Sequence, residues 1–293
     1  MSKKIHNKIK KTFDKCILDQ VSKILPHTRK HLYSDEYCLS MFKFMLNDTV
    51  RWSSLKIASD YNNKKTYHYK YLNAIYNKWS RKDIFKKAYI EMLQTEYFKL
   101  KHIKKSDSIN MFIDCSFMSN MYGVDCKATN PEYKKKKFTK ISAICDEENN
   151  IISLTYDKTH VTKRNNRAFS HDITLAQPTL DEMFINLKSN NTAKLCGDKG
   201  YISTQKFKLN NKKEIKIIAP KRENQKTKNT AEDEEILKKR STIERCFAPL
   251  KKYSRVCIRR DQNIESYINF IYLALLDIFY KKNINNDNDN LST

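Results

Sequence analysis

The spacing of apolar residues in this chain changes near residue 105, and this change constrains the fold more than any other feature. Between Ser34 and Leu46, apolar side chains recur at helical intervals. From Met111–Asp114 onward, they gather instead in short runs that are typical of strands. The sequence therefore predicts a helical domain over residues 1–105, an α/β domain over residues 106–282 and a polar, disordered tail over residues 283–293.

The expected elements of residues 106–282 follow the order strand, hairpin, helix, strand, helix, strand, helix. The strands are expected at Met111–Asp114, Phe138–Cys145, Ile151–Asp157, Lys194–Gly197 and Glu214–Ala219. Gln177-Pro178 opens the first helix, and Thr230 caps a long helix that carries Glu244. This order predicts a central mixed sheet flanked by helices.

Three acidic residues are placed so that they could hold a divalent cation. Asp114 and Asp198 each end a short apolar run, and Glu244 lies on the expected long helix. Arg240 and Lys251 are spaced to share the helical face of Glu244. A set of ligands made only of oxygen suits a hard cation, so we expect Asp114, Asp198 and Glu244 to bind Mg²⁺ or Mn²⁺.

At these residues the chain resembles the DDE transposases encoded by bacterial insertion sequences. Their signature Tyr-x2-Arg-x3-Glu-x6-Lys is matched at Arg240, Glu244 and Lys251, whereas Leu237 stands at the Tyr position. The resemblance also includes the motifs Asp114-x-Ser116, His171-Asp172 and Asp198-Lys-Gly-Tyr201, and it extends upstream to a helical amino-terminal domain.

The resemblance implies a ribonuclease-H-like catalytic core with Asp114, Asp198 and Glu244 as catalytic residues. Two Mg²⁺ or Mn²⁺ ions at these carboxylates would support phosphodiester hydrolysis and then transfer of the freed 3′-OH ends to target DNA. The candidate phosphate contacts at this site are Arg240, Arg245 and Lys251. His171 and Asp172 are expected to shape the loop before a helix.

The amino-terminal domain has the pattern of a helix-turn-helix. A short helix at Leu55–Ser59 and a turn at Asn62-Asn63 precede a second helix at Thr66–Trp79. A plain helical bundle fits the pattern equally well, and the resemblance favours DNA binding. The candidate DNA contacts of this domain are Lys64, Lys65 and Lys70.

The composition predicts a nucleic-acid partner inside the cell. The formal net charge is +24, and basic residues outnumber acidic ones in both halves of the chain. The alternative is a Lys-rich composition that reflects an AT-rich genome. None of the 8 cysteines forms a C-x2-C pair, so we expect no zinc site and a reducing compartment. We expect neither a signal peptide nor a membrane span.

The predicted function is that of a transposase that binds the ends of its mobile element in double-stranded DNA, forming a homo-oligomer on that DNA. Two alternatives remain open. One is a ribonuclease-H-like nuclease or resolvase without strand transfer, and the other is a domesticated relative that only binds DNA. The three acids argue against the second alternative, and the Arg-x3-Glu-x6-Lys spacing argues against the first.

Overall fold

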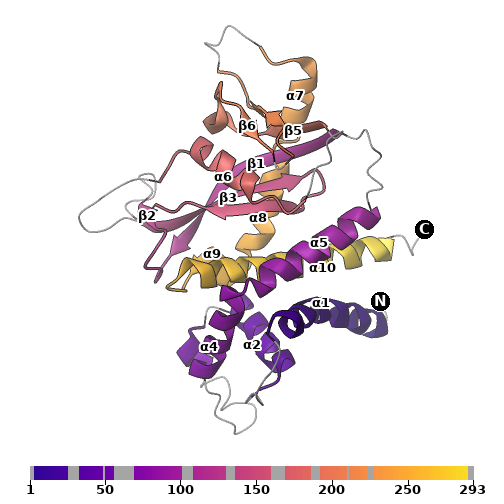
Figure 1. Cartoon of the computed structure of the whole chain (residues 1–293), viewed down its shortest axis with the longest axis vertical. Coiled ribbons are helices and arrows are strands. Elements are labelled where there is room, and N and C mark those ends of the chain that lie inside the picture. The colour runs from indigo at the N-terminus through magenta and orange to yellow at the C-terminus, as the bar shows by residue number, and fades with distance from the viewer. Residues whose placement is uncertain are drawn as a thin grey trace. The chain divides into compact units, whose positions relative to one another are not determined.

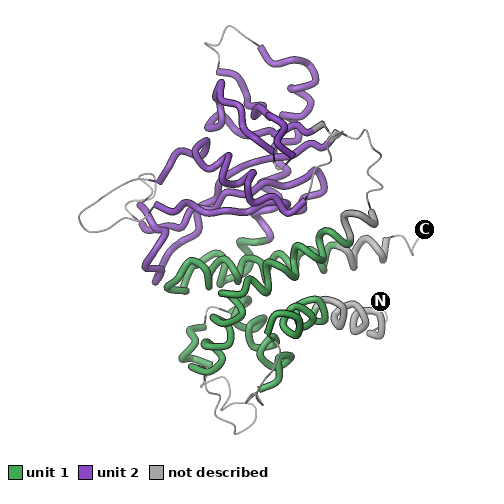
Figure 2. Tube along the Cα trace, in the orientation of Figure 1, with its two compact units in different colours: residues 1–95, 250–293 green, residues 96–249 purple. Residues whose placement is uncertain are grey.

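The structure is a computed structural model that divides into two compact units (Figure 2). Unit 1 comprises residues 1–95 and 250–293, and unit 2 comprises residues 96–249. The structure describes residues 3–25, 33–48, 50–55, 69–100, 108–129, 136–159, 169–185, 192–209, 211–222 and 228–289. These units differ from the domains 1–105 and 106–282 that the sequence predicts, because residues 250–293 cluster with the amino-terminal helices.

Unit 1 is helical (Figure 1). Its described helices are α1 (Lys3–Ile24), α2 (Asp35–Asn47), η1 (Trp52–Ser54), α4 (Tyr69–Arg81), α5 (Ile84–Leu100), α9 (Ser254–Cys257) and α10 (Ile264–Asp289). Ser34 begins α2 as expected, since its side chain accepts a hydrogen bond from the N–H of Tyr37 (3.2 Å). α10 continues to Asp289, so part of the tail that the sequence predicts to be disordered is helical.

An aromatic core joins α4 and α10 within unit 1. The ring of Tyr76 stacks on that of Phe270 with their centroids 4.3 Å apart, and Phe42 meets Tyr76 edge-on at 5.0 Å. The hydroxyl of Tyr76 donates to the carbonyl oxygen of Ser266 (2.8 Å). Trp79 is buried in the same unit. The carboxy-terminal helix thus supplies part of the core on which the amino-terminal helices fold.

The predicted helix-turn-helix is not tested, because residues 56–68 lie outside the described part of the chain. η1 and α4 flank that segment. None of the described helices is long and apolar enough to cross a membrane.

Unit 2 is built on a mixed sheet. Its described strands are β1 (Ser108–Asn120), β2 (Ala128–Thr129), β3 (Lys137–Asp146), β4 (Ile151–Tyr156), β5 (Thr192–Cys196) and β8 (Ile217–Ile218), while β6 (Phe207–Lys208) and β7 (Glu214–Ile215) pair separately. The strand order is β2-β3-β1-β5-β8, and β4 pairs with β3 as the expected hairpin. β3 is antiparallel to β1, whereas β5 is parallel to it.

Helices cover both faces of this sheet. They are η3 (Asp172–Leu175), α6 (Ala176–Asp181), η4 (Lys199–Tyr201), α7 (Ala231–Lys238) and α8 (Thr242–Lys251). Thr179 of α6 donates to the hydroxyl of Ser142 (2.7 Å), and Cys246 of α8 hydrogen-bonds Cys145. Ser142 and Cys145 point to opposite faces because side chains alternate along a strand. The expected ribonuclease-H-like α/β core, with a helical amino-terminal region, is therefore confirmed.

Two expected elements are wrong in detail. The long helix after Thr230 is broken into α7 and α8 by a turn at residues 239–241, although the predicted cap at Thr230 forms a capping box with Asp233. The helix that Gln177-Pro178 was expected to open begins slightly earlier and ends at Asp181.

Candidate metal centre

Strand pairing brings Asp114 and Asp198 together, as the sequence predicts. The parallel pairing of β1 with β5 ends at Phe112 opposite Cys196. Asp114 and Asp198 each lie two residues beyond that pair, so both side chains occupy the same point along the sheet. Asp114 does not end its strand, however, because β1 continues to Asn120 and remains paired with β3. The site therefore lies where β5 stops and β1 goes on.

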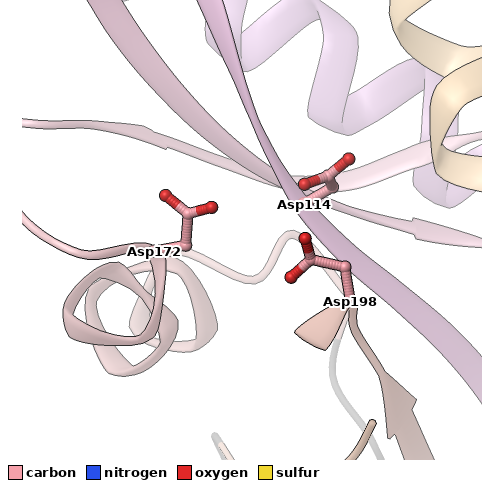
Figure 3. A group of neighbouring side chains, drawn as sticks. All are labelled: Asp114, Asp172 and Asp198. Atoms are coloured by element: carbon pink, nitrogen blue, oxygen red, sulfur yellow. The ribbon is translucent and has the colours of Figure 1, made fainter. Parts of the chain in front are cut away.

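A third carboxylate, that of Asp172, completes the cluster in the structure. Asp172 begins η3, and its side chain points toward Asp114 and Asp198 (Figure 3). Ligand oxygens from Asp114, Asp172 and Asp198 all lie within 4.8 Å of one another, the only such group among the described residues. Carboxylate oxygens at this spacing fit a hard divalent cation, so these residues could hold Mg²⁺ or Mn²⁺.

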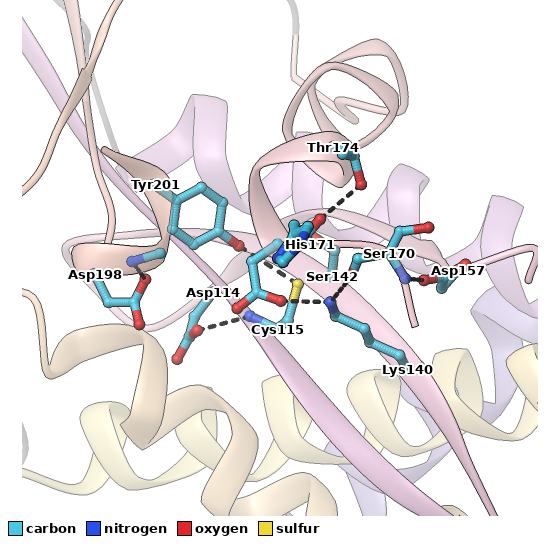
Figure 4. Close-up of polar contacts among 12 residues, drawn as sticks. Asp114, Cys115, Lys140, Ser142, Asp157, Ser170, His171, Thr174, Asp198 and Tyr201 are labelled. Carbon is cyan, nitrogen blue, oxygen red and sulfur yellow. Dashed lines mark hydrogen bonds and ion pairs between the residues drawn. The ribbon is translucent and has the colours of Figure 1, made fainter. Parts of the chain in front are cut away.

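Backbone amides hold two of the three carboxylates (Figure 4). On β1, the N–H of Cys115 donates to Oδ1 of Asp114 (2.7 Å). The N–H of Gly200 donates to Oδ1 of Asp198 (2.8 Å), so Asp198 caps η4. A Cβ at Gly200 would stand 3.0 Å from that oxygen. Glycine at position 200 therefore lets the backbone approach the carboxylate closely.

The electrostatics of the cluster oppose the ionised form of Asp114. Burial is the main reason that the pKa of Asp114 is raised to about 6, and the negative charges of Asp198 and Asp172 raise it further. The N–H of Cys115 and the cation of Arg240 act in the opposite direction. A divalent cation between these acids would offset their repulsion, which is why a carboxylate cluster of this kind suits a metal.

Glu244 lies outside the carboxylate cluster. It is in the first turn of α8, with 56% of its side chain exposed, and its Oε1 is 3.1 Å from Nη1 of Arg240. Because α7 ends at Lys238, Arg240 lies in the turn before α8 and shares no continuous helix with Glu244. The ligand role of Glu244 thus stays a prediction. Its ion-pair partner Arg240 also acts to lower the pKa of Asp114.

The other predicted phosphate contacts are dispersed. Arg245 is exposed and donates to Oγ1 of Thr242 (2.9 Å) and Oδ1 of Asn149 (3.3 Å). Lys251, in the last turn of α8, and Lys70, in the first turn of α4, are also exposed. Lys64 and Lys65 lie outside the described residues. These basic residues remain candidates for DNA contacts.

The sequence pattern does not place Asp172 in the cluster. The His171-Asp172 pair predicts only two residues that shape the loop before a helix. The signal that could have revealed more is Lys140, a lysine inside the apolar run Phe138–Cys145. A charge in a buried strand needs a partner, and its partner in the structure is Asp172.

A comparison with protein families matches residues 138–264 to the family described as Transposase DDE domain. No curated protein and no solved structure matches the chain. The matched range runs from β3 to the first residue of α10 and includes Asp172, Asp198 and Glu244, while Asp114 precedes it. The match supports a DDE transposase, through a transposase DDE domain that covers most of the ribonuclease-H-like core.

Proposed function

We propose that this protein binds the ends of its mobile element, cleaves the DNA there by metal-dependent hydrolysis and joins the freed 3′-OH ends to target DNA. The observation that carries the proposal is the meeting of Asp114, Asp172 and Asp198 within 4.8 Å in a chain with a transposase DDE domain. The net charge of +24 supports double-stranded DNA as the partner. The protein would act where that DNA is, as a homo-oligomer assembled on the two ends.

The protein's own groups have distinct tasks in this reaction. Asp114 and Asp198 would hold the two Mg²⁺ or Mn²⁺ ions, with Asp172 as a third oxygen donor and Glu244 as the ligand that the family signature implies. The bound ions supply an activated water and stabilise the leaving oxygen. Arg240 would contact a phosphate by two parallel hydrogen bonds, with Arg245 and Lys251 as further phosphate contacts.

Arg240 also suggests how Glu244 would reach the site. Its guanidinium is paired with Glu244, and the pair is partly exposed, so the contact is worth at most about 1 kcal/mol. A DNA phosphate that takes Arg240 would release Glu244 at little cost.

The experiment is an end-cleavage and strand-transfer assay with the full chain. The substrate is DNA flanking the gene, which should contain short inverted terminal repeats. We expect cleavage and joining with Mg²⁺ or Mn²⁺, and neither with a chelator. The variants Asp114→Asn, Asp198→Asn and Glu244→Gln should each abolish cleavage but retain DNA binding.

Three outcomes would count against the proposal. Cleavage by Asp114→Asn or Asp198→Asn at the wild-type rate would remove that residue from the site. Cleavage by Glu244→Gln at that rate would leave Asp172 as the third ligand. Cleavage without joining under all metal conditions would instead favour a nuclease or resolvase.

A further inference from the structure

The side chain of Lys140 is buried in unit 2, with only 2% of its surface exposed. A lysine ammonium is strongly hydrated, so burying it is costly unless charged and polar partners replace the lost water. Lys140 lies on β3, and its pairing partner on β1 is Phe117. Lys140 therefore places a buried positive charge beside Asp172 of the carboxylate cluster.

Three groups surround this ammonium, and Figure 4 shows its hydrogen bond to Ser170. Nζ of Lys140 forms an ion pair with Oδ1 of Asp172 and donates to the carbonyl oxygen of Ser170 (2.5 Å). It also lies 5.7 Å from the ring centroid of Phe117. The two polar partners of the ammonium, Ser170 and Asp172, therefore flank His171 at the start of η3.

Asp157 holds the same segment from its other side. Oδ2 of Asp157 accepts from the N–H of Ser170 (2.9 Å), and the N–H of Asp157 donates to the carbonyl oxygen of Lys140 (3.0 Å). Ser170 is thus fixed through both its N–H and its carbonyl oxygen. These two hydrogen bonds fix the backbone just before η3, and so they fix the position of Asp172, the first residue of that helix.

The two oxygens of Asp172 face different neighbours. Oδ1 is taken by Lys140. A Cβ built at Gly200 would lie 3.7 Å from Oδ2 of Asp172 and 3.0 Å from Oδ1 of Asp198. Oδ2 of Asp172 therefore lies on the Asp198 side, where it can serve the cluster while Oδ1 serves Lys140.

We propose that Lys140 is a positioning residue that holds Asp172 in the carboxylate cluster with Oδ2 directed at the cation. The inference rests on the proposed metal-dependent function. Without Lys140, Asp114 and Asp198 would repel Asp172, whose side chain is 30% exposed and can turn toward water. Residues that hydrogen-bond a ligating carboxylate commonly tune metal affinity by tenfold or more.

The ammonium also has an effect of opposite sign, because it repels a bound cation. The two effects make different predictions. If Lys140 acts by positioning Asp172, its removal weakens cation binding, and the loss depends on Asp172. If it acts only by repulsion, its removal strengthens cation binding whether or not Asp172 is present.

The test measures Mn²⁺ binding to the full chain without DNA, by the loss of the free-ion electron paramagnetic resonance signal. We expect Lys140→Met to raise the dissociation constant about tenfold. In an Asp172→Asn background, Lys140→Met should change the constant by less than about twofold. The control is Lys206→Met, which removes the same charge from the exposed Lys206–Glu214 ion pair of unit 2 and should bind Mn²⁺ as wild type does.

Circular dichroism would show whether each variant is folded. If Lys140→Met does not fold, Lys140→Gln keeps one donor for Asp172 or Ser170 and should show a smaller loss of affinity. Unchanged or tighter Mn²⁺ binding by a folded Lys140 variant would overturn the inference. An equal loss of affinity in the Asp172→Asn background would also overturn it. A wild-type chain that binds no Mn²⁺ would instead count against the proposed function itself.

Discussion

At the scale of single residues, the fold places Asp114 where burial and neighbouring carboxylates destabilise its negative charge. The residue lies mid-strand, partly buried, with two other carboxylates within 4.8 Å. A folded protein retains such an arrangement when a ligand offsets the cost, since binding to the folded state alone stabilises it. The cost should therefore be measurable in the absence of divalent cations.

Replacing Asp114 by Asn should stabilise the protein when divalent cations are chelated. The pKa of Asp114 in the folded state, about 6, lies above the ordinary value of 3.8. The stability linked to its protonation is therefore complete below pH 3.8 and is lost as the pH rises through about 6. Asp114→Asn escapes that loss, so its advantage should grow over this range to at most about 3 kcal/mol.

Thermal unfolding with a chelator, at several pH values, measures this advantage. Glu235→Gln, in an exposed acid of α7, serves as the control for removing one negative charge. Addition of Mg²⁺ should raise the melting temperature of the wild type more than that of Asp114→Asn. An advantage that does not depend on pH would show that repulsion at Asp114 is not its cause.

At the scale of elements, the turn after β5 decides how Asp198 is presented. Gly197 and Gly200 flank Asp198 and play different parts. A Cβ at Gly197 would stand 2.7 Å from the ring of Tyr201, which is fully buried. A Cβ at Gly200 would instead meet Oδ1 of Asp198 at 3.0 Å. The absence of a side chain at Gly197 leaves room for the buried ring of Tyr201, and its absence at Gly200 leaves room for the carboxylate of Asp198.

The two glycines should respond differently to substitution by alanine. Gly197→Ala forces the Tyr201 ring to move within the core, so we expect a loss of roughly 1–3 kcal/mol in unfolding free energy. Gly200→Ala should leave stability nearly unchanged but weaken Mn²⁺ binding, because the added methyl group displaces the Asp198 carboxylate. Denaturant unfolding and Mn²⁺ titration of both variants distinguish the two effects. The same loss of stability in both would contradict these separate roles.

At the scale of the whole molecule, unit 1 is assembled from the two ends of the chain. The core of α4 depends on α10, through the stacking of Tyr76 on Phe270 and the hydrogen bond from Tyr76 to Ser266. Along the sequence, the strands of unit 2 are therefore flanked by two segments that fold together in unit 1. A fragment that stops near residue 105 lacks part of its own core.

Residues 1–105 expressed alone should consequently be poorly folded. We expect circular dichroism to show reduced helix content and a broad thermal transition, because the apolar faces of α4 and α5 lose their packing against α10. Joining residues 1–105 to residues 250–289 through a flexible linker should restore a cooperative transition. A cooperative transition in the shorter fragment would show that α10 is dispensable.

DNA binding by the full chain should be strongly salt-dependent. The net charge of +24 implies that several phosphates are neutralised on binding, and the released counterions make affinity fall as salt rises. Fluorescence anisotropy across salt concentrations measures the slope. If Lys70 contacts a phosphate, Lys70→Ala should reduce that slope by about one. An affinity that is insensitive to salt would contradict a polyanionic partner.

The sequence by itself determined most of the strands and helices, because apolar spacing specifies them locally. The adjacency of Asp114 and Asp198 follows instead from the ribonuclease-H-like fold that the family resemblance implies. The expectation of Mg²⁺ or Mn²⁺ came from the residue types, because carboxylate oxygens are the ligands that hard cations prefer. The fold class was therefore predictable, and the family match agrees with it.

Only the tertiary structure decided the membership of the cluster and the composition of the units. Asp172 joins Asp114 because Lys140 and Asp157, distant in sequence, anchor the segment before η3. α10 joins the amino-terminal helices because its apolar sides match theirs, which its own periodicity cannot reveal. Partners that are remote along the chain leave no local pattern, so their pairing emerges only when the packing of the whole core is known.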